Sequence, residues 1–170
     1  KVTIPEGLSL VQMADKRPNP EGFLAAVQSI NTQEIFGVDA PTIEGFLMPN
    51  TYFFSGEPSE EEVVQRMVEQ FQQDYSALMA KYPDKVSLNP VEVLTIASLI
   101  EEEARLDDER ALVSAVVHNR LKKNMRLEMD STLQYSLGKY GQRLLNEDKE
   151  VDSPYNTYKH RGLPPGPISN

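Results

Sequence analysis

The most regular pattern in the chain is a helical repeat of apolar side chains over residues 59–81. Ser59 and Glu62 have the spacing of a capping box at its start, and Pro83 follows its end. Apolar side chains recur every three or four residues, at Val64, Met67 or Val68, Phe71, Tyr75 and Leu78. The pattern predicts a long helix that packs this stripe against the protein core.

A second helix is predicted to begin at Pro90, because proline suits the first helical position and Asn89 can act as the N-cap. Residues 93–100 are apolar almost all round, which is typical of a deeply buried helix. This apolar run leads directly into three consecutive acids, residues 101–103. The pattern therefore predicts carboxylates at the edge of a core.

Shorter elements are predicted towards the N-terminus. Residues 2–4 can form a strand, and residues 9–14 and 20–29 have the pattern of two short helices separated by a proline-rich turn. The aromatic and apolar residues of the segment 41–58, which include Phe53, suggest one or two short buried strands around a turn.

The C-terminal half begins with a further predicted helix over residues 106–124. Its expected buried face is formed by Leu112, Val113, Val116, Val117 and Leu121. Glycine and proline punctuate residues 125–170, which favours strands and ordered loops there. Together the elements predict an α+β protein, with a small α/β piece at residues 1–40 and a larger mixed subdomain at residues 41–170.

Composition excludes several classes of function. The chain has 170 residues, a formal net charge of −9 and no cysteine. Scattered basic residues and a negative charge argue against nucleic acid as a partner, and the lack of cysteine excludes thiolate catalysis and cysteine-ligated zinc. The longest apolar run, residues 93–100, is far shorter than the roughly 20 residues that a membrane-spanning helix needs.

Glu101 is the first candidate for chemistry, because desolvation at the end of an apolar helix suits a carboxyl group to general acid catalysis. Helical spacing places Glu101 on the stripe of Leu94, Ala97 and Ser98. Glu103 follows an equally apolar stripe, so periodicity does not choose between the two acids. A third interpretation is that all three acids form a solvated helix end.

Other candidate sites are weaker or absent. The acids near residues 101–109 lack the spacing and the glycine of a calcium loop, and no zinc-protease or serine-hydrolase motif occurs, so no metal and no cofactor is expected. The tail contains Tyr155, Asn156 and Tyr158 on a proline-rich segment. Aromatic rings stack on sugar faces and an amide binds hydroxyl or acetamido groups, so this tail is either a carbohydrate platform or a C-terminal cap.

These segments combine into a resemblance to a known family. The matching stretches occur in the same order over nearly the whole chain: residues 3–7, 44–52, 97–101, 109–110, 119–121, 125–135 and 153–168. The chain resembles the YceG-like family of endolytic murein transglycosylases. Departures from the family pattern occur at Met48, Asn50, Glu128 and Ser131.

The resemblance implies specific roles. The family's catalytic glutamate ends the Ala-Ser-Leu-Ile-Glu motif, which corresponds to Glu101. The matching motif positions imply substrate-binding roles in the cleft for Glu44, Asn119, Asp130, Thr132, Tyr135, Tyr155, Asn156 and Tyr158. Residues 1–40 are similar to the remainder of a LysM-like sugar-binding module, and residues 41–170 correspond to the catalytic domain.

The resemblance also implies an activity and a location. Members cleave the bond between N-acetylmuramic acid and N-acetylglucosamine in peptidoglycan strands without water, and leave 1,6-anhydro ends. They carry a membrane anchor, here expected upstream of Lys1, and act on the outer side of the bacterial cell membrane, with peptidoglycan synthases as implied partners. The alternative function is a non-catalytic peptidoglycan-binding module of a cell-wall synthesis complex.

Overall fold

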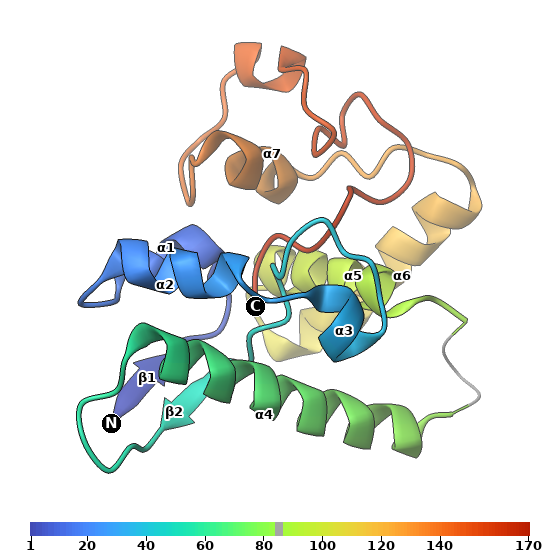
Figure 1. Cartoon of the computed structure of the whole chain (residues 1–170). Coiled ribbons are helices and arrows are strands. Elements are labelled where there is room, and N and C mark those ends of the chain that lie inside the picture. Colours follow the sequence, from blue (N-terminus) through green and yellow to red (C-terminus); the bar gives the residue numbers. More distant parts are fainter. Residues whose placement is uncertain (84–86) are drawn as a thin grey trace. The chain divides into compact units, whose positions relative to one another are not determined.

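The computed structural model describes residues 1–83 and 87–170 and divides the chain into two compact units. The first unit contains residues 1–91 together with Ser169 and Asn170, and the second contains residues 92–168. Mixed helices with one small sheet confirm the α+β class (Figure 1). The domain boundary predicted after residue 40 falls inside the first unit. Compactness alone does not test it, so that boundary stays a prediction.

The first unit contains one antiparallel strand pair and four helices. Strand β1 (Val2–Ile4) pairs with β2 (Asn50–Tyr52), and the three helices between them in sequence are α1 (Leu10–Asp15), α2 (Pro20–Gln28) and α3 (Thr32–Phe36). Helix α4 (Glu60–Lys81) follows and packs against α2. The predicted strand at residues 2–4 and the predicted helices at 9–14, 20–29 and 59–81 are confirmed to within a residue or two.

Local signals explain why these elements form where they do. Ser9 and Ser59 each accept a hydrogen bond from the backbone N–H three residues later, and the side chains of Gln12 and Glu62 bond back to the cap, which completes two capping boxes. In β1, Val2 and Ile4 are buried while Thr3 is exposed, which is the alternation of a half-buried strand.

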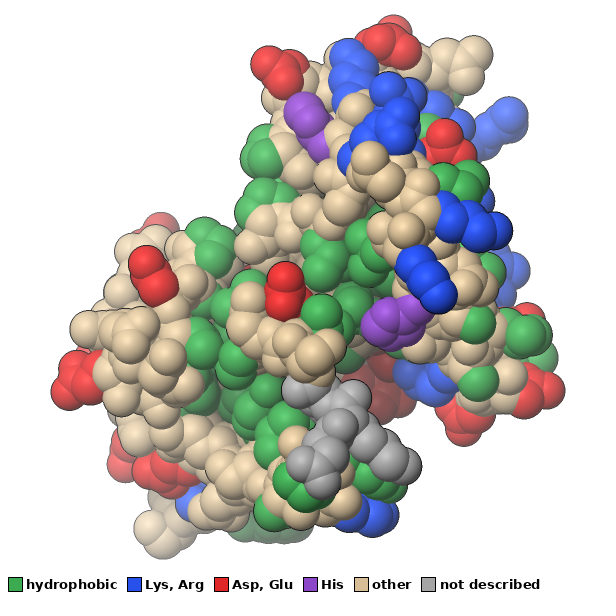
Figure 2. All heavy atoms as spheres, turned by 90° about the vertical axis from the view of Figure 1, so that its right-hand side faces the viewer, with side chains coloured by type: hydrophobic (Ala, Val, Ile, Leu, Met, Phe, Trp, Pro, Cys, Tyr) green, Lys and Arg blue, Asp and Glu red, His purple; other side chains and the backbone are tan. Residues whose placement is uncertain are grey.

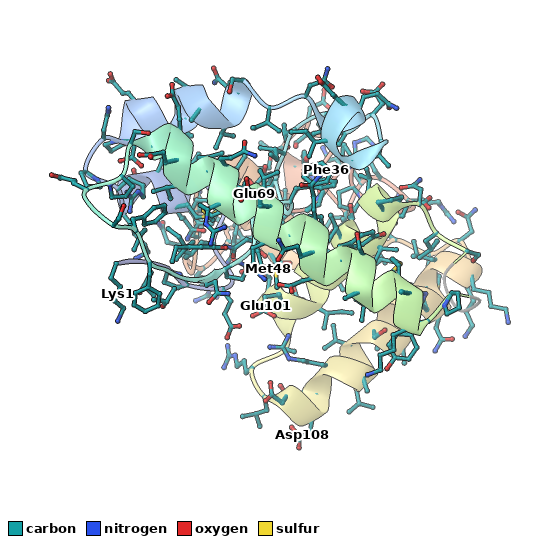
Figure 3. The ribbon with its side chains drawn as sticks, turned by 60° about the horizontal axis from the view of Figure 1, so that its bottom comes forward. Lys1, Phe36, Met48, Glu69, Glu101 and Asp108 are labelled. Atoms are coloured by element: carbon teal, nitrogen blue, oxygen red, sulfur yellow. The ribbon has the colours of Figure 1, made fainter. Side chains whose placement is uncertain are left out.

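A cluster of aromatic rings forms part of the first unit's core. Phe36, Phe46 and Phe71 are in mutual contact, with ring centroids 4.7–5.4 Å apart. Figure 3 shows Phe36 on α3 beside the ribbon of α4. Two predicted core positions are wrong: the Phe53 side chain is 75% exposed and Leu78 is 48% exposed. Phe53 follows the last residue of β2, and Leu78 lies in the last turn of α4.

The second unit is built from short helices and ordered loops. It contains α5 (Pro90–Glu103) from Glu92 onward, a 3-10 turn η1 (Asp107–Glu109), α6 (Arg110–Lys122), α7 (Asp130–Leu137) and a second 3-10 turn η2 (Glu147–Glu150). Within its described residues no helix is long and apolar enough to cross a lipid bilayer, and the same holds for the described part of the first unit.

Three expectations for the second unit are corrected. Helix α5 is less deeply buried than predicted, since Ala97 is exposed and only Thr95, Ile96, Ser98 and Leu99 are buried. On α6 only Val117 is buried, while Leu112 and Val116 are exposed, because helical spacing identifies an apolar face but not whether another element covers it.

The third correction concerns residues 125–170, which contain a helix where strands were predicted. Helix α7 buries Ser131, Thr132 and Leu133 and ends at Gly138, which adopts the left-handed conformation with φ of 65°. The described part of this segment has one isolated β-bridge, between Arg126 and Arg161, and no longer strand. Helix α7 spans eight residues, too short for a clear apolar repeat to distinguish it from a loop.

Candidate active site

Glu101 lies in the last turn of α5, where the buried part of the helix gives way to solvent (Figure 3). Its side chain is 24% exposed, whereas Glu102 and Glu103 are both exposed residues. The helix is fixed near this point by Ser98, whose hydroxyl donates to the Thr95 carbonyl and accepts from the backbone N–H of Ile168 at 3.1 Å. The structure therefore distinguishes Glu101 from its neighbours by burial, which periodicity did not do.

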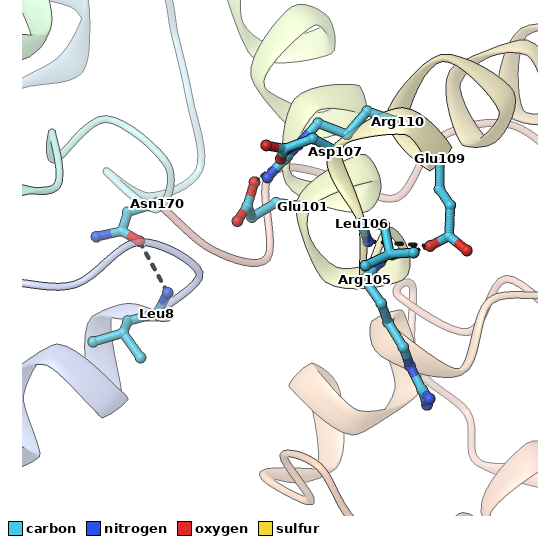
Figure 4. Close-up of polar contacts among 8 residues, drawn as sticks. All are labelled: Leu8, Glu101, Arg105, Leu106, Asp107, Glu109, Arg110 and Asn170. Carbon is cyan, nitrogen blue, oxygen red and sulfur yellow. Dashed lines mark hydrogen bonds and ion pairs between the residues drawn. The ribbon is translucent and has the colours of Figure 1, made fainter.

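Arg110, the first residue of α6, forms an ion pair with Glu101. Its Nη1 lies 2.5 Å from Glu101 Oε2, and its Nε donates to Asp107 Oδ1 at 3.2 Å (Figure 4). The hydrogen bond to Glu101, followed by the one to Asp107, raises the pKa of Arg110 above its ordinary value. Periodicity predicted a desolvated carboxyl group, and the structure instead pairs it with a guanidinium.

Glu103 makes a different contact from Glu101. Its Oε1 accepts a hydrogen bond of 2.7 Å from the hydroxyl of Ser131, in the first turn of α7. The two acids that the sequence left as alternatives therefore have different partners, a cation for Glu101 and a hydroxyl for Glu103.

Thr157 joins two of the segments that carry the family resemblance. Its carbonyl accepts from the N–H of Glu128, and its hydroxyl accepts from the N–H of Met129 at 2.9 Å. The same hydroxyl lies 3.0 Å from that of Thr132, and both threonines are buried. Glu128 adopts the left-handed backbone conformation, with φ of 52°, which a non-glycine residue rarely does. The loop before α7 is thus fixed against the tail.

The tail tyrosines form polar and aromatic contacts. The Tyr158 hydroxyl donates to Asp130 Oδ1 at 2.6 Å, and Lys149 Nζ lies 4.4 Å from the centre of the Tyr158 ring. Burial, followed by the contact with Asp130, raises the pKa of Tyr158 above its ordinary value. The rings of Tyr135 and Tyr155 lie 5.0 Å apart. The structure thus brings Asp130 together with Tyr158, and Tyr135 with Tyr155.

Asn156 is fully buried, and its side chain is occupied by the tail itself. Its amide nitrogen donates to the carbonyls of Lys149 and Val151 at 2.9 and 2.8 Å, and its Oδ1 accepts from the N–H of Tyr158. Asn119 is an exposed residue on α6.

Glu44 belongs to the first unit, not to the unit that contains Glu101. Its side chain is 2% exposed, and both carboxylate oxygens accept from the N–H of Leu10 at 3.1 Å. In the described ranges, no group of three or more His, Asp or Glu side chains could hold a metal ion. Both histidines are exposed, and Figure 2 shows histidine side chains at the surface.

Sequence reasoning assigned no role to Arg110, Thr157 or Ser131. Arg110 stood in a matching stretch, but its spacing from Glu101 crosses the end of one helix and the start of another, where periodicity carries no information. Thr157 stood between two selected residues, and its importance comes from contacts with residues 25 to 29 positions away.

Comparison with known proteins gives concordant matches. The profile of the YceG-like family matches residues 1–170. The endolytic murein transglycosylase of Bacillus subtilis (strain 168) is 46% identical over 132 residues, which cover 75% of this chain and 36% of that protein. The endolytic murein transglycosylase of Streptococcus pneumoniae serotype 2 (strain D39) is 32% identical over 99% of this chain and 36% of its own length.

A solved structure shares the fold. The crystal structure of a YceG-like protein from Listeria monocytogenes matches with a TM-score of 0.76 and 36% identity, over 100% of this chain and 62% of that one. The chain spans about a third of the length of the two curated relatives (36% of each).

Proposed function

Because the chain belongs to the YceG-like family, we propose that it is the catalytic part of an endolytic murein transglycosylase that cleaves peptidoglycan glycan strands. The names of its relatives support the substrate and the reaction. The observation that carries the proposal is the position of Glu101, a partly buried carboxylate at the end of α5, a helix that is bonded through Ser98 to Ile168 near the end of the tail.

One carboxyl group can perform the whole reaction. Protonated Glu101 donates its proton to the oxygen that links C1 of N-acetylmuramic acid to N-acetylglucosamine. The C1–O bond breaks, and its electron pair remains on the departing hydroxyl. The C6 hydroxyl of the same muramic acid then forms a bond to C1 and gives its proton to the Glu101 carboxylate, which restores the acid and leaves a 1,6-anhydro end.

The contacts of the other candidate acids support a mechanism with one carboxylate. A hydrolase of the usual kind needs a second carboxyl group about 5–9.5 Å from the first. Asp130 accepts a hydrogen bond from Tyr158, and Glu44 is almost fully buried and bonded to the backbone. Glu44 therefore has a structural use, and Asp130 is held by Tyr158.

We propose that the remaining residues that match the family motif have two kinds of role, contact with the glycan and support of the fold. Asn119, Asp130, Tyr135, Tyr155 and Tyr158 contact the glycan, because these side chains are partly or fully exposed. Thr132 and Asn156 are buried and hold the loops that carry the binding residues, whereas Glu44 is buried in the first unit and bonded to the backbone of Leu10. The glycan is proposed to bind along the end of α5 and the tail.

The setting of the whole protein is also proposed from the family. The catalytic part acts outside the cell membrane, attached by an anchor that precedes Lys1, and works beside the synthases that build the glycan. Residues 1–40 are proposed to be the remainder of a LysM-like module.

Digestion of purified peptidoglycan sacculi tests the proposed function. The protein is expected to release fragments with 1,6-anhydro ends, identified by mass spectrometry. The Glu101→Gln variant should lose at least about 100-fold in rate, because general acid–base catalysis contributes roughly 10²–10⁴-fold. It should keep its fold and should still sediment with sacculi.

Glu103→Gln is the matched control, because it changes the acid that periodicity could not exclude. It should retain most of the activity. Reducing ends instead of anhydro ends would show a hydrolase, and retention on sacculi without any product would show the alternative, a binding module. Full activity of Glu101→Gln would exclude Glu101 as the catalytic acid.

A further inference from the structure

The ion pair at the end of α5 suggests a role for a residue outside the proposed catalytic set. Arg110 approaches Glu101 from the start of α6, and its guanidinium is held from the other side by Asp107 of η1. Asp107 is 97% exposed, whereas the Arg110 and Glu101 side chains are 39% and 24% exposed. Glu101 is therefore the more buried partner of the pair.

The contact uses only one oxygen of the carboxylate. Arg110 Nη1 binds Oε2, while Oε1 makes no hydrogen bond within the part of the chain that the structure describes. A guanidinium donates in fixed directions, so this contact restrains the position of Oε2. Oε1 is the oxygen left available to exchange a proton with the glycan.

The other charged groups near Glu101 in the sequence are mostly acidic. Glu102 and Glu103 stand beside it on α5, Asp107 faces the site from η1, and all carry negative charge. The C-terminal end of a helix carries a partial negative charge, and the last turn of α5 contains no basic residue. Arg110 of α6 is the cation that contacts Glu101.

We propose that Arg110 is a positioning residue for the reaction, which orients Glu101 and controls its ionisation by stabilising the carboxylate that remains after the proton has been donated. The inference rests on the proposed function. Asp107 assists by holding the Nε edge of the guanidinium, so that Nη1 remains directed at Glu101.

The proposal makes a direct prediction for the titration of Glu101. The Glu101 side-chain carboxyl carbon, labelled with ¹³C, is followed by NMR across pH in the unmodified protein and in Arg110→Gln. Its titration midpoint should move to higher pH in the variant. Arg110→Lys keeps the charge but loses the fork, so its midpoint should lie between the two.

Activity provides a second readout. Arg110→Gln should lower kcat about 10- to 100-fold, as expected for loss of a charge-assisted hydrogen bond, with KM nearly unchanged because Arg110 does not bind the glycan. The falling limb of the pH–rate profile should move to higher pH with the titration midpoint. A residue that only stabilised the fold would not move this limb.

Arg105→Gln is the matched control. Arg105 lies five residues earlier, its side chain points away from Glu101, and it makes no ion pair with a described residue (Figure 4). This variant should leave both the titration and the rate unchanged, and thermal melting should show that all variants are folded.

The two proposals can fail separately. An identical Glu101 midpoint in the unmodified protein and in Arg110→Gln would overturn the role of Arg110, whatever the activity. A shifted midpoint in a protein that releases no product from sacculi would support the control of ionisation by Arg110 and overturn the proposed function.

Discussion

Asp148 shows how one buried residue makes the stability of the second unit depend on pH. Its side chain is 8% exposed, Lys139 Nζ lies 2.6 Å from one oxygen, and the Leu145 N–H donates to the other at 2.7 Å. The bond from Lys139, followed by that from Leu145, lowers the pKa of Asp148 below its ordinary value of 3.8. The ionised form is therefore more stable in the folded protein than in the unfolded chain.

The sign of the pH dependence follows from this direction. The unfolded chain binds a proton at Asp148 more readily, so the stabilisation is fully present above the ordinary pKa and is lost as pH falls through the lowered one. Asp148→Asn should be less stable than the unmodified protein near neutral pH, and the difference should shrink in acid. Urea unfolding at several pH values between about 2 and 7 measures this, with Asp152→Asn, an exposed acid, as the control.

At the residue scale, the sequence predicted the site only in part. The family motif selected Glu101 as the candidate acid, which periodicity alone could not separate from Glu103, and its role stays a prediction. Arg110 could not be found in this way, because its contact with Glu101 depends on the turn between two helices. Asn156 was expected to bind sugar through its amide, and the structure uses that amide for three hydrogen bonds inside the tail. Whether it also contacts glycan stays a prediction.

At the element scale, capping residues contribute a measurable part of the stability of α4. Ser59 accepts from the N–H of Glu62, and the Glu62 side chain accepts from the N–H of Ser59. Ser59→Ala should lower the free energy of unfolding by about 0.5–2 kcal/mol. Urea unfolding gives this value.

Ser76→Ala is the matched control, because Ser76 is an exposed position inside the same helix. Alanine is the better helix former, so this change should be neutral or slightly stabilising. Equal destabilisation by both substitutions would show that the capping box is not what stabilises the start of α4.

Helices that begin with a capping box or a proline were predicted well. Features that depend on contacts with other elements, such as the burial of α6 and the presence of α7, were not. The capping box at Ser59 and the proline at position 90 gave correct helix starts. The exposure of Leu112 on α6 could not be foreseen, since the pattern of one helix does not reveal what covers it. Helix α7 was missed because residues 131–133, its buried part, include a serine and a threonine that are satisfied by partners distant in sequence.

At the scale of the whole molecule, the chain returns to its first unit after completing the second. The Asn170 N–H donates to the Leu8 carbonyl, and its Oδ1 accepts from the Leu8 N–H, both at 2.9 Å. Its Nδ2 also donates to the Pro5 carbonyl at 3.2 Å. The second unit is therefore an insertion in the first, and the first unit is completed by residues from both ends of the sequence.

Asn170→Ala should weaken the first unit and not the second. Loss of the side-chain partner leaves the Leu8 N–H unsatisfied, which costs about 1–3 kcal/mol. Hydrogen exchange followed by mass spectrometry should show faster exchange in peptides from residues 1–83 and unchanged exchange in α7. Asn170→Asp keeps an acceptor for Leu8 and should have a smaller effect. Uniformly faster exchange in both units would contradict the division.

The hydrogen bonds between Leu8 and Asn170 also make the Leu8 amide a probe of contact between the two ends of the first unit. The amide proton of Leu8 can exchange with deuterium only when its hydrogen bond to Asn170, 162 positions away, is broken. The NMR peak of the Leu8 amide would then report, without any attached dye, whether Leu8 and Asn170 are hydrogen-bonded in a given buffer, variant or mixture with sugar fragments.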